Sequence, residues 1–154
     1  MIRFGSAATR ATNSMNDETC FVDTNILVYA HTPNEGRKYS IAKSLVDDLW
    51  LSHRGVLSTQ VFQEFCVVLT QKMRPPRSVT ETVERAQNFL SWRTITVSAE
   101  LAISALEFSS SHKLSYWDAL IIGAAHSAQC SILFSEDLNN GQRFGSLRVV
   151  NPFL

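Results

Sequence analysis

Short apolar runs alternate along the chain with longer stretches in which apolar residues recur at helical spacing. Ile41, Leu45 and Leu49, for example, recur every fourth residue, which predicts an amphipathic helix over residues 40–53. Ser78, with Glu81 three residues later, forms a capping-box pattern that predicts the start of another helix. The predicted strands span residues 20–22, 55–58, 94–97, 131–134 and 147–150, and the predicted helices span residues 40–53, 59–74, 78–91, 100–112 and 115–128.

The alternation of strands and helices indicates the fold class. Strands that are separated by helices pair in parallel, and the connecting helices cover both faces of the sheet. The chain shows no internal repeat and no interdomain linker. We therefore predict a three-layer α/β sandwich, with a central parallel sheet flanked by helices, formed by residues 19–154 as a single domain.

Four acidic residues are expected to meet at one edge of this sheet. Asp23 and Asp137 each follow a predicted strand, and Asp118 lies in the first turn of the helix that leads into the second of these strands. A helix runs antiparallel to the strand on which it packs, so its start and the end of that strand share an edge, where sites of such sheets lie. Glu64 lies early in the helix that follows residues 55–58, on its buried side, where a lone carboxylate is unfavourable unless paired or bound to metal.

Each of these acids also has a purely structural explanation. Asp23 could cap a helix, Ser115 and Asp118 could form a capping box, Asp137 could belong to a turn, and Glu64 could pair with an arginine. Four carboxylates within reach of one another raise each other's pKa, and such a group is tolerated when a hard divalent cation lies among them. Oxygen ligands without nearby cysteine or histidine favour Mg²⁺ or Mn²⁺ over Zn²⁺.

Composition narrows the picture further. The 154 residues suit one domain, and 45% apolar against 18% charged residues excludes a disordered chain. Lys plus Arg equals Asp plus Glu, 14 against 14, so any binding of nucleic acid must be local or act through a metal. Three cysteines without CxxC spacing predict reduced thiols in a cytoplasmic protein, and we expect all three to be small core residues. No apolar run is long enough for a membrane span. We interpret residues 1–18 as a disordered tail or a mis-assigned start ahead of Met15.

Four segments together resemble a known family. These are VDTNILVYA at 22–30, QEF at 63–65, YWDALI at 116–121 and SEDL at 135–138. In this order and spacing they resemble the PIN-domain ribonucleases, and in particular the VapC-type toxins of bacterial toxin–antitoxin pairs. The D-T-N opening alone is a weak motif, whereas the combination is specific. The resemblance runs from about residue 19 to the C-terminus and implies a PIN-like fold.

The resemblance also implies an activity. It implies a metal-dependent endoribonuclease that cleaves RNA phosphodiesters by two-metal hydrolysis and that uses one or two Mg²⁺ or Mn²⁺ ions. Its catalytic and metal-binding residues would be Asp23, Glu64, Asp118 and Asp137, supported by Thr24, Asn25 and Ser135. The implied partners are an RNA substrate, a cognate antitoxin protein and a second copy of the chain in a homodimer.

Further residues are candidates for contacts with RNA. Lys72, Arg74 and Arg77 flank a Pro-Pro turn and could contact phosphates, although they could equally be a solvated helix end. Tyr116 could stack on a base or pack within the protein. Trp117 shares the helical spacing of the apolar residues that follow it, which predicts a core position.

Three other functions fit parts of the same pattern. A freestanding RNA-processing nuclease would carry the same acids, and a non-catalytic protein-binding module would use them as helix caps. A phosphorylation receiver domain fits less well. It needs adjacent acids before the acceptor strand and a lysine at the end of a late strand. In this chain the adjacent acids Asp17 and Glu18 lie only at the start of the first strand, and Lys113 is the only lysine after His112.

Overall fold

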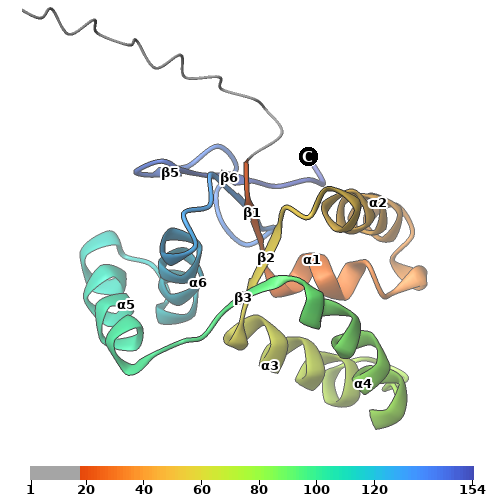
Figure 1. The fold of residues 1–154 in the computed structure, drawn as a ribbon. Helices are drawn as coiled ribbons and strands as arrows, with labels where there is room; N and C mark the ends of the chain where they lie inside the picture. The colour runs from red at the N-terminus through yellow and green to blue at the C-terminus, as the bar shows by residue number, and fades with distance from the viewer. Residues whose placement is uncertain (1–17) are drawn as a thin grey trace, which may run out of the picture.

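The structure, a computed structural model, describes residues 18–154, and our interpretation of residues 1–17 lies outside the part described (Figure 1). The strands are β1 (Cys20–Val22), β2 (Gly55–Ser58), β3 (Arg93–Ile95), β4 (Ile132–Phe134), β5 (Arg143–Phe144) and β6 (Leu147–Val150). The α-helices are α1 (Thr24–Tyr29), α2 (Arg37–Ser52), α3 (Thr59–Val67), α4 (Val79–Asn88), α5 (Ala99–His112) and α6 (Tyr116–Ser127). Shorter helical turns span Pro33–Glu35, Val68–Lys72 and Phe89–Ser91.

The strands form one six-stranded sheet in the order β3-β2-β1-β4-β6-β5. Neighbouring strands are parallel except at the edge, where β5 runs antiparallel to β6. Helices α1 and α2 lie on one side of the sheet and α5 and α6 on the other, with α3 and α4 beyond its lower end (Figure 1). The predicted α/β sandwich with a central, mainly parallel sheet is therefore confirmed, and β1 lies in its interior.

Most predicted elements are present with small changes in their bounds. Strand β3 occupies residues 93–95 rather than 94–97. The helix expected over residues 59–74 is α-helical only as far as Val67, and a π-helical turn over Val68–Lys72 follows it. Helix α1 was not predicted, because its six residues are too few to display a helical period. The two-residue strand β5 was not predicted either, because so short a segment has no recognisable alternation.

Serine residues begin four of the helices. The hydroxyls of Ser58, Ser78, Ser98 and Ser115 each accept a hydrogen bond from the backbone N–H three residues later. At Ser78 the predicted capping box is complete, because the Glu81 side chain accepts the Ser78 backbone N–H in return. These bonds satisfy amide groups that a helix start otherwise leaves without a partner. They fix where α3 and α6, which carry two of the candidate acids, begin.

The core lies on both faces of the sheet. The strand residues Phe21, Leu57 and Leu133 are completely buried. At Gly55 the backbone approaches the Trp92 ring so closely that a Cβ atom would lie 2.3 Å from it, so only glycine fits there. No helix within residues 18–154 is long and apolar enough to cross a membrane.

The three cysteines are free thiols. Cys20 and Cys130 are buried as predicted, and burial raises the pKa of the Cys20 thiol to about 11. Cys66 is only half-buried, so the prediction that all three belong to the core is wrong for this residue. It lies on α3 beside the fully buried Phe65, on a part of the helix that is only partly covered.

Candidate functional site

The carboxyl ends of the two central strands place Asp23 and Ser135 next to each other. Val22 pairs with Phe134 across the parallel β1–β4 ladder, and the Asp23 backbone N–H continues it by donating to the Phe134 carbonyl at 3.0 Å. The Ser135 hydroxyl then donates to Asp23 Oδ2 at 2.7 Å. Segments 112 residues apart in the sequence are thus joined through their side chains at the sheet edge.

Asp23 is a buried carboxyl group. Its side chain and backbone are only 6% exposed, and its Oδ1 atom accepts the Thr24 backbone N–H at 2.7 Å, which caps α1. Burial raises the pKa of Asp23 to about 7, against the opposing effect of the hydrogen bonds from Ser135 and Thr24. The nearby carboxylates of Asp137 and Glu64 raise this pKa further. Asp23 is therefore both a helix cap and a member of an acidic group.

Asp137 is held by the loop that follows β4. The Asn25 side-chain amide donates to Asp137 Oδ2 at 2.9 Å, and the Asp137 backbone N–H donates to the Ser135 hydroxyl at 3.2 Å. The carbonyl oxygen of the same Asn25 amide accepts the Glu136 backbone N–H at 3.4 Å. Asn25 thus orients the segment after β4, and Asp137 itself remains exposed to solvent.

Glu64 reaches the same edge from α3. The Thr24 hydroxyl donates to Glu64 Oε2 at 2.6 Å, and the Gln60 side-chain amide donates to Glu64 Oε1 at 2.9 Å. No arginine pairs with Glu64 within residues 18–154, so the structural explanation considered for this acid does not hold. Its two oxygens are instead fixed by neutral donors.

Asp118 is the least tightly connected of the four acids. Its backbone N–H donates to the Ser115 hydroxyl at 3.0 Å, but its carboxylate forms no hydrogen bond or ion pair with any of residues 18–154. The start of α6 is nevertheless tied to α3, because the Gln60 amide also donates to the Trp117 carbonyl at 3.4 Å. The contacts therefore link Asp23, Asp137 and Glu64, and they attach the Asp118 turn through its neighbour.

The donor set suits a hard divalent cation. Among residues 18–154, no lysine, arginine or histidine forms an ion pair with any of the four acids, so their charge is not compensated by the protein. The side chains at this edge offer oxygen atoms, which Mg²⁺ and Mn²⁺ prefer. Within the same residues, however, no group of three or more acidic, histidine or cysteine side chains lies close enough together to hold a metal ion as the side chains stand.

Two positions near the site were missed by the sequence analysis. Gln60 is buried and binds Glu64, and its place four residues before Glu64 on one helix could have indicated the contact. Glu136 accepts a hydrogen bond from the Tyr29 hydroxyl at 2.7 Å and pairs with Lys38, whose ammonium lies 4.8 Å from the centre of the Tyr29 ring. The contacts of Glu136 with Tyr29 and Lys38 join segments far apart in the sequence, so no local sequence pattern predicts them.

The basic residues of the Pro-Pro turn differ in their surroundings. Arg77 donates to the His31 carbonyl at 2.9 Å, and Arg74 donates to the carbonyls of Gln71 and Met73, so both guanidinium groups are engaged by the protein. Lys72 instead lines a groove that also contains Glu64.

The two aromatic residues at the start of α6 differ in their burial, and the exposure of Trp117 contradicts the prediction made from its spacing. Tyr116 is half-buried against the apolar cluster of Ala105 and Leu120. Trp117 is 61% exposed, so the predicted core position is wrong. In a helix the side chains lean toward the N-terminus, so a residue in the first turn projects past the start of the helix instead of onto the face that its spacing indicates.

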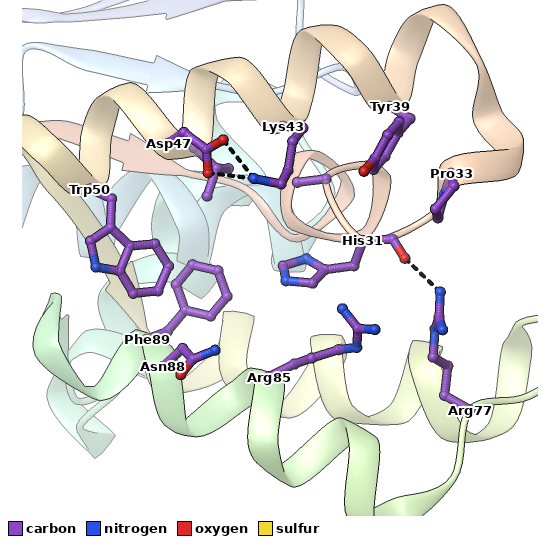
Figure 2. A pocket seen from close by; sticks show the side chains of 12 residues that line it. His31, Pro33, Tyr39, Lys43, Asp47, Trp50, Arg77, Arg85, Asn88 and Phe89 are labelled. Atoms are coloured by element: carbon purple, nitrogen blue, oxygen red, sulfur yellow. Dashed lines mark hydrogen bonds and ion pairs between the residues drawn. The ribbon is translucent and has the colours of Figure 1, made fainter.

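A separate cavity of about 450 Å³ lies between α2 and α4 (Figure 2). Its walls combine aromatic rings with three cationic side chains, Lys43, Arg77 and Arg85, of which Lys43 pairs with Asp47. Burial lowers the pKa of His31, which lies in the cavity wall, and the nearby cations lower it further. None of the four candidate acids lines this cavity, so the acidic edge and the cationic cavity are different places on the protein.

An acidic group at the carboxyl ends of parallel strands defines an α/β domain of the kind that carries its site at the sheet edge. The sequence profile of the PIN domain matches residues 20–142, more than half of the chain. The protein therefore belongs to the PIN domain family, as the sequence motifs indicated. A comparison with curated proteins gives no match.

Three solved structures share the fold at low sequence identity. VapC20 of Mycobacterium tuberculosis, a toxin that cleaves the sarcin-ricin loop, is 21% identical with a TM-score of 0.61, covering 77% of this chain and 90% of that one. A toxin–antitoxin complex from Klebsiella pneumoniae is 19% identical with a TM-score of 0.65, covering 87% and 98%. VapBC2 from Rickettsia felis, bound to a fragment of its promoter DNA, is 19% identical with a TM-score of 0.55, covering 85% and 96%.

Proposed function

We propose that this protein is a divalent-metal-dependent endoribonuclease and the toxin of a toxin–antitoxin pair. The observation that carries the proposal is the buried Asp23 carboxyl, which shares the sheet edge with Glu64 and Asp137 and has no cationic partner among residues 18–154. A purely structural buried acid would be expected to have such a partner. Membership of the PIN family and the likeness to toxin structures support the same conclusion.

In this proposal the four acids Asp23, Glu64, Asp118 and Asp137 supply the oxygen ligands of one or two Mg²⁺ or Mn²⁺ ions. Such an ion, when bound, lowers the pKa of a coordinated water and offsets charge on the phosphate that is cut. The protein's own part is to hold the ligands. Thr24 and Gln60 fix both oxygens of Glu64, while Ser135 and the Thr24 amide fix both oxygens of Asp23. Little ordering of these side chains is then needed when the substrate binds.

The remaining parts of the proposal concern assembly and location. We propose a cognate antitoxin that suppresses cleavage, and a homodimer in the cytoplasm. The exposed apolar side chains Ile103 and Leu106 on α5 support a protein contact, and the free thiols suit a reducing compartment. A freestanding RNA-processing nuclease would instead have no inhibitory partner. Co-expression with the product of an adjacent reading frame distinguishes the two, because only an antitoxin restores the growth of cells that produce the protein.

The decisive test compares wild-type protein with the Asp118→Asn variant on total RNA, with and without Mg²⁺, followed by mapping of the cut ends. We expect metal-dependent cleavage by the wild type that leaves 5′-phosphates, and a loss of at least a hundredfold in the variant, because one metal ligand is removed. Asp48→Asn, which changes an exposed acid on α2, is the matched control and should cleave normally. If purified wild-type protein cuts no RNA in the presence of Mg²⁺, the protein-binding module becomes the better explanation.

A further inference from the structure

A groove of about 430 Å³ runs from the acidic edge between α3 and the start of α6. Its lining includes Glu64, so it is continuous with the candidate metal ligands, and it includes Trp117, the residue directly before Asp118. Lys72 at the end of the π-helical turn also lines it. Whatever occupies this groove therefore lies within reach of any phosphate held at the acids.

One wall of the groove is an aromatic ring that the protein leaves uncovered. Trp117 is 61% exposed, although tryptophan is usually well covered in folded proteins. Its ring packs edge-to-face on Tyr116, with centroids 5.1 Å apart, and Tyr116 is itself anchored on the apolar cluster beneath α6. The indole is thus held at the groove by an anchored neighbour while it remains open to solvent. Exposed aromatic rings of this kind stack on unpaired nucleobases.

Polar groups in the groove match the other parts of a nucleotide. Gln60 is 5% exposed, and both acceptors near its amide nitrogen, Glu64 Oε1 and the Trp117 carbonyl, fix the orientation of the amide. Its oxygen Oε1 is buried and has no hydrogen-bond partner among residues 18–154, so Gln60 shapes the floor of the groove and is not counted as a contact to the base. Gln63 is exposed and adds a second amide. Lys72, which forms no ion pair within the same residues, can contact a phosphate.

We propose that this groove binds one unpaired nucleotide of the RNA substrate beside the phosphate that is cut. The base stacks on Trp117, its edge faces the exposed Gln63 amide, and Lys72 contacts the adjoining phosphate. A base that is paired in a helix cannot present its face in this way, so the groove selects single-stranded segments. The proposal rests on the proposed ribonuclease function and assigns Trp117, rather than Tyr116, as the stacking residue.

The first experiment pairs a protein change with a substrate change. An RNA oligonucleotide with the mapped cleavage site is prepared intact and with an abasic ribose at each position that flanks the cut. We expect Trp117→Ala to cleave the intact RNA about ten-fold more slowly, the size of effect that follows from loss of one stacked base. One abasic position should slow the wild type by a similar factor and leave Trp117→Ala almost unaffected, and Trp117→Phe should retain most of the activity.

Controls separate this effect from damage to the fold or to the metal site. Leu51→Ala removes another strongly exposed apolar side chain, far from the groove on α2, and should cleave at the wild-type rate. Trp117→Ala should show the same rise in melting temperature with Mn²⁺ as the wild type. If Trp117→Ala cleaves normally, or if the abasic position slows it as much as the wild type, the groove does not bind a base.

A second measurement keeps the inference independent of cleavage. In the Asp118→Asn protein, a short single-stranded RNA should quench tryptophan fluorescence, and the quenching should disappear when Trp117 is also changed to Phe. Trp92 is buried and Trp50 is half-buried, so neither should report on a ligand in the groove. Quenching without any cleavage by the wild type would refute the proposed ribonuclease activity but support nucleotide binding in the groove. An absence of quenching would refute nucleotide binding in the groove.

Discussion

At the scale of single residues, Asp23 combines two roles that the sequence analysis treated as alternatives. Its Oδ1 atom caps α1 through the Thr24 amide, and its Oδ2 atom receives the Ser135 hydroxyl in the acidic group. The carboxyl is buried next to two other acids, so its ionised form is destabilised in the folded protein. A cap alone would not need Ser135 or the neighbouring carboxylates.

This environment makes the stability of the metal-free protein depend on pH. The pKa of Asp23 is about 7 in the folded protein against 3.8 as its ordinary value, so the folded state binds the proton more tightly. The free energy of unfolding should therefore fall by a few kcal/mol as the pH rises from about 4 to 7, because folding then requires a buried negative charge. Urea unfolding in the presence of a chelator measures the effect.

Asp23→Asn provides the comparison for this prediction. The amide cannot ionise, so the variant should show a flatter pH dependence and should equal or exceed the wild type in stability at pH 7. At the same time its RNA cleavage should fall by orders of magnitude. A strongly destabilised Asp23→Asn protein, with the pH dependence unchanged, would mean that capping is the main role of this residue.

The sequence pattern identified candidate site residues where their position relative to a strand or a helix start was enough to select them. Asp23 and Asp137 could be chosen as candidates because each follows a strand, Asp118 because it lies in the first turn of a helix, and Glu64 because it lies on the buried side of an early helical turn; none of these choices requires knowledge of tertiary contacts. Trp117 could not be assigned in the same way, because helical spacing says which face a residue shares but not whether anything packs against the first turn. The contact of Gln60 with Glu64 could have been predicted from their spacing of four residues on one helix. Although its side chain is neutral, Gln60 holds one oxygen of Glu64 and also contacts the start of α6.

At the scale of elements, helix starts position the acids. Ser58 begins α3, which carries Glu64, and Ser115 begins α6, which carries Asp118 in its first turn. The acceptor of the Asp118 backbone N–H is the Ser115 hydroxyl itself, so the cap and the carboxylate belong to one turn. The helix start is therefore part of the site at α6.

Two serine-to-alanine variants separate capping from site geometry. Ser78→Ala and Ser115→Ala each remove one N-cap and should each lower the free energy of unfolding by about 1 kcal/mol in urea unfolding. Only Ser115→Ala loosens the turn of Asp118, so it should also slow RNA cleavage several-fold, while Ser78→Ala should cleave normally at a temperature where both are folded. Equal activity in the two variants would show that the cap does not position Asp118.

Element boundaries were predictable where a cap or a proline defined them. Ser78, Ser115 and the Pro-Pro turn after the π-helical segment all mark ends that the structure reproduces. Helix α1 and strand β5 were missed because they are short, and their existence depends on packing against the rest of the protein. The antiparallel direction of β5 follows from a tight reversal before β6, which has no helix between its strands.

At the scale of the whole molecule, the charges balance in number but not in place. Lys plus Arg and Asp plus Glu are 14 each, yet the acidic edge has no cationic partner among the described residues, while three cations surround the cavity between α2 and α4. The order of the strands, which brings β1 beside β4, creates the acidic edge. That order was not deducible from the sequence, because alternation predicts parallel strands without saying which ones are neighbours.

A divalent ion should stabilise the whole fold by binding this edge. With Mn²⁺ at about a hundred times its dissociation constant, mass action adds about 2.7 kcal/mol, which corresponds to a rise of roughly 5–10 °C in melting temperature for a domain of this size. Thermal melting with and without Mn²⁺ measures the shift. Asp118→Asn should reduce it and Asp48→Asn should not, whereas an equal shift in all three proteins would place the ion somewhere else.

The sheet order also has a consequence for how the protein is made. Asp23 and Asp137 are 114 residues apart (137 − 23). Strand β1 cannot pair with its neighbour β4 until β4 has been synthesised. A growing polypeptide on the ribosome therefore lacks a complete set of acids until residue 137 has been translated. Under the proposed ribonuclease function, the nascent chain would therefore cleave no RNA during its own synthesis.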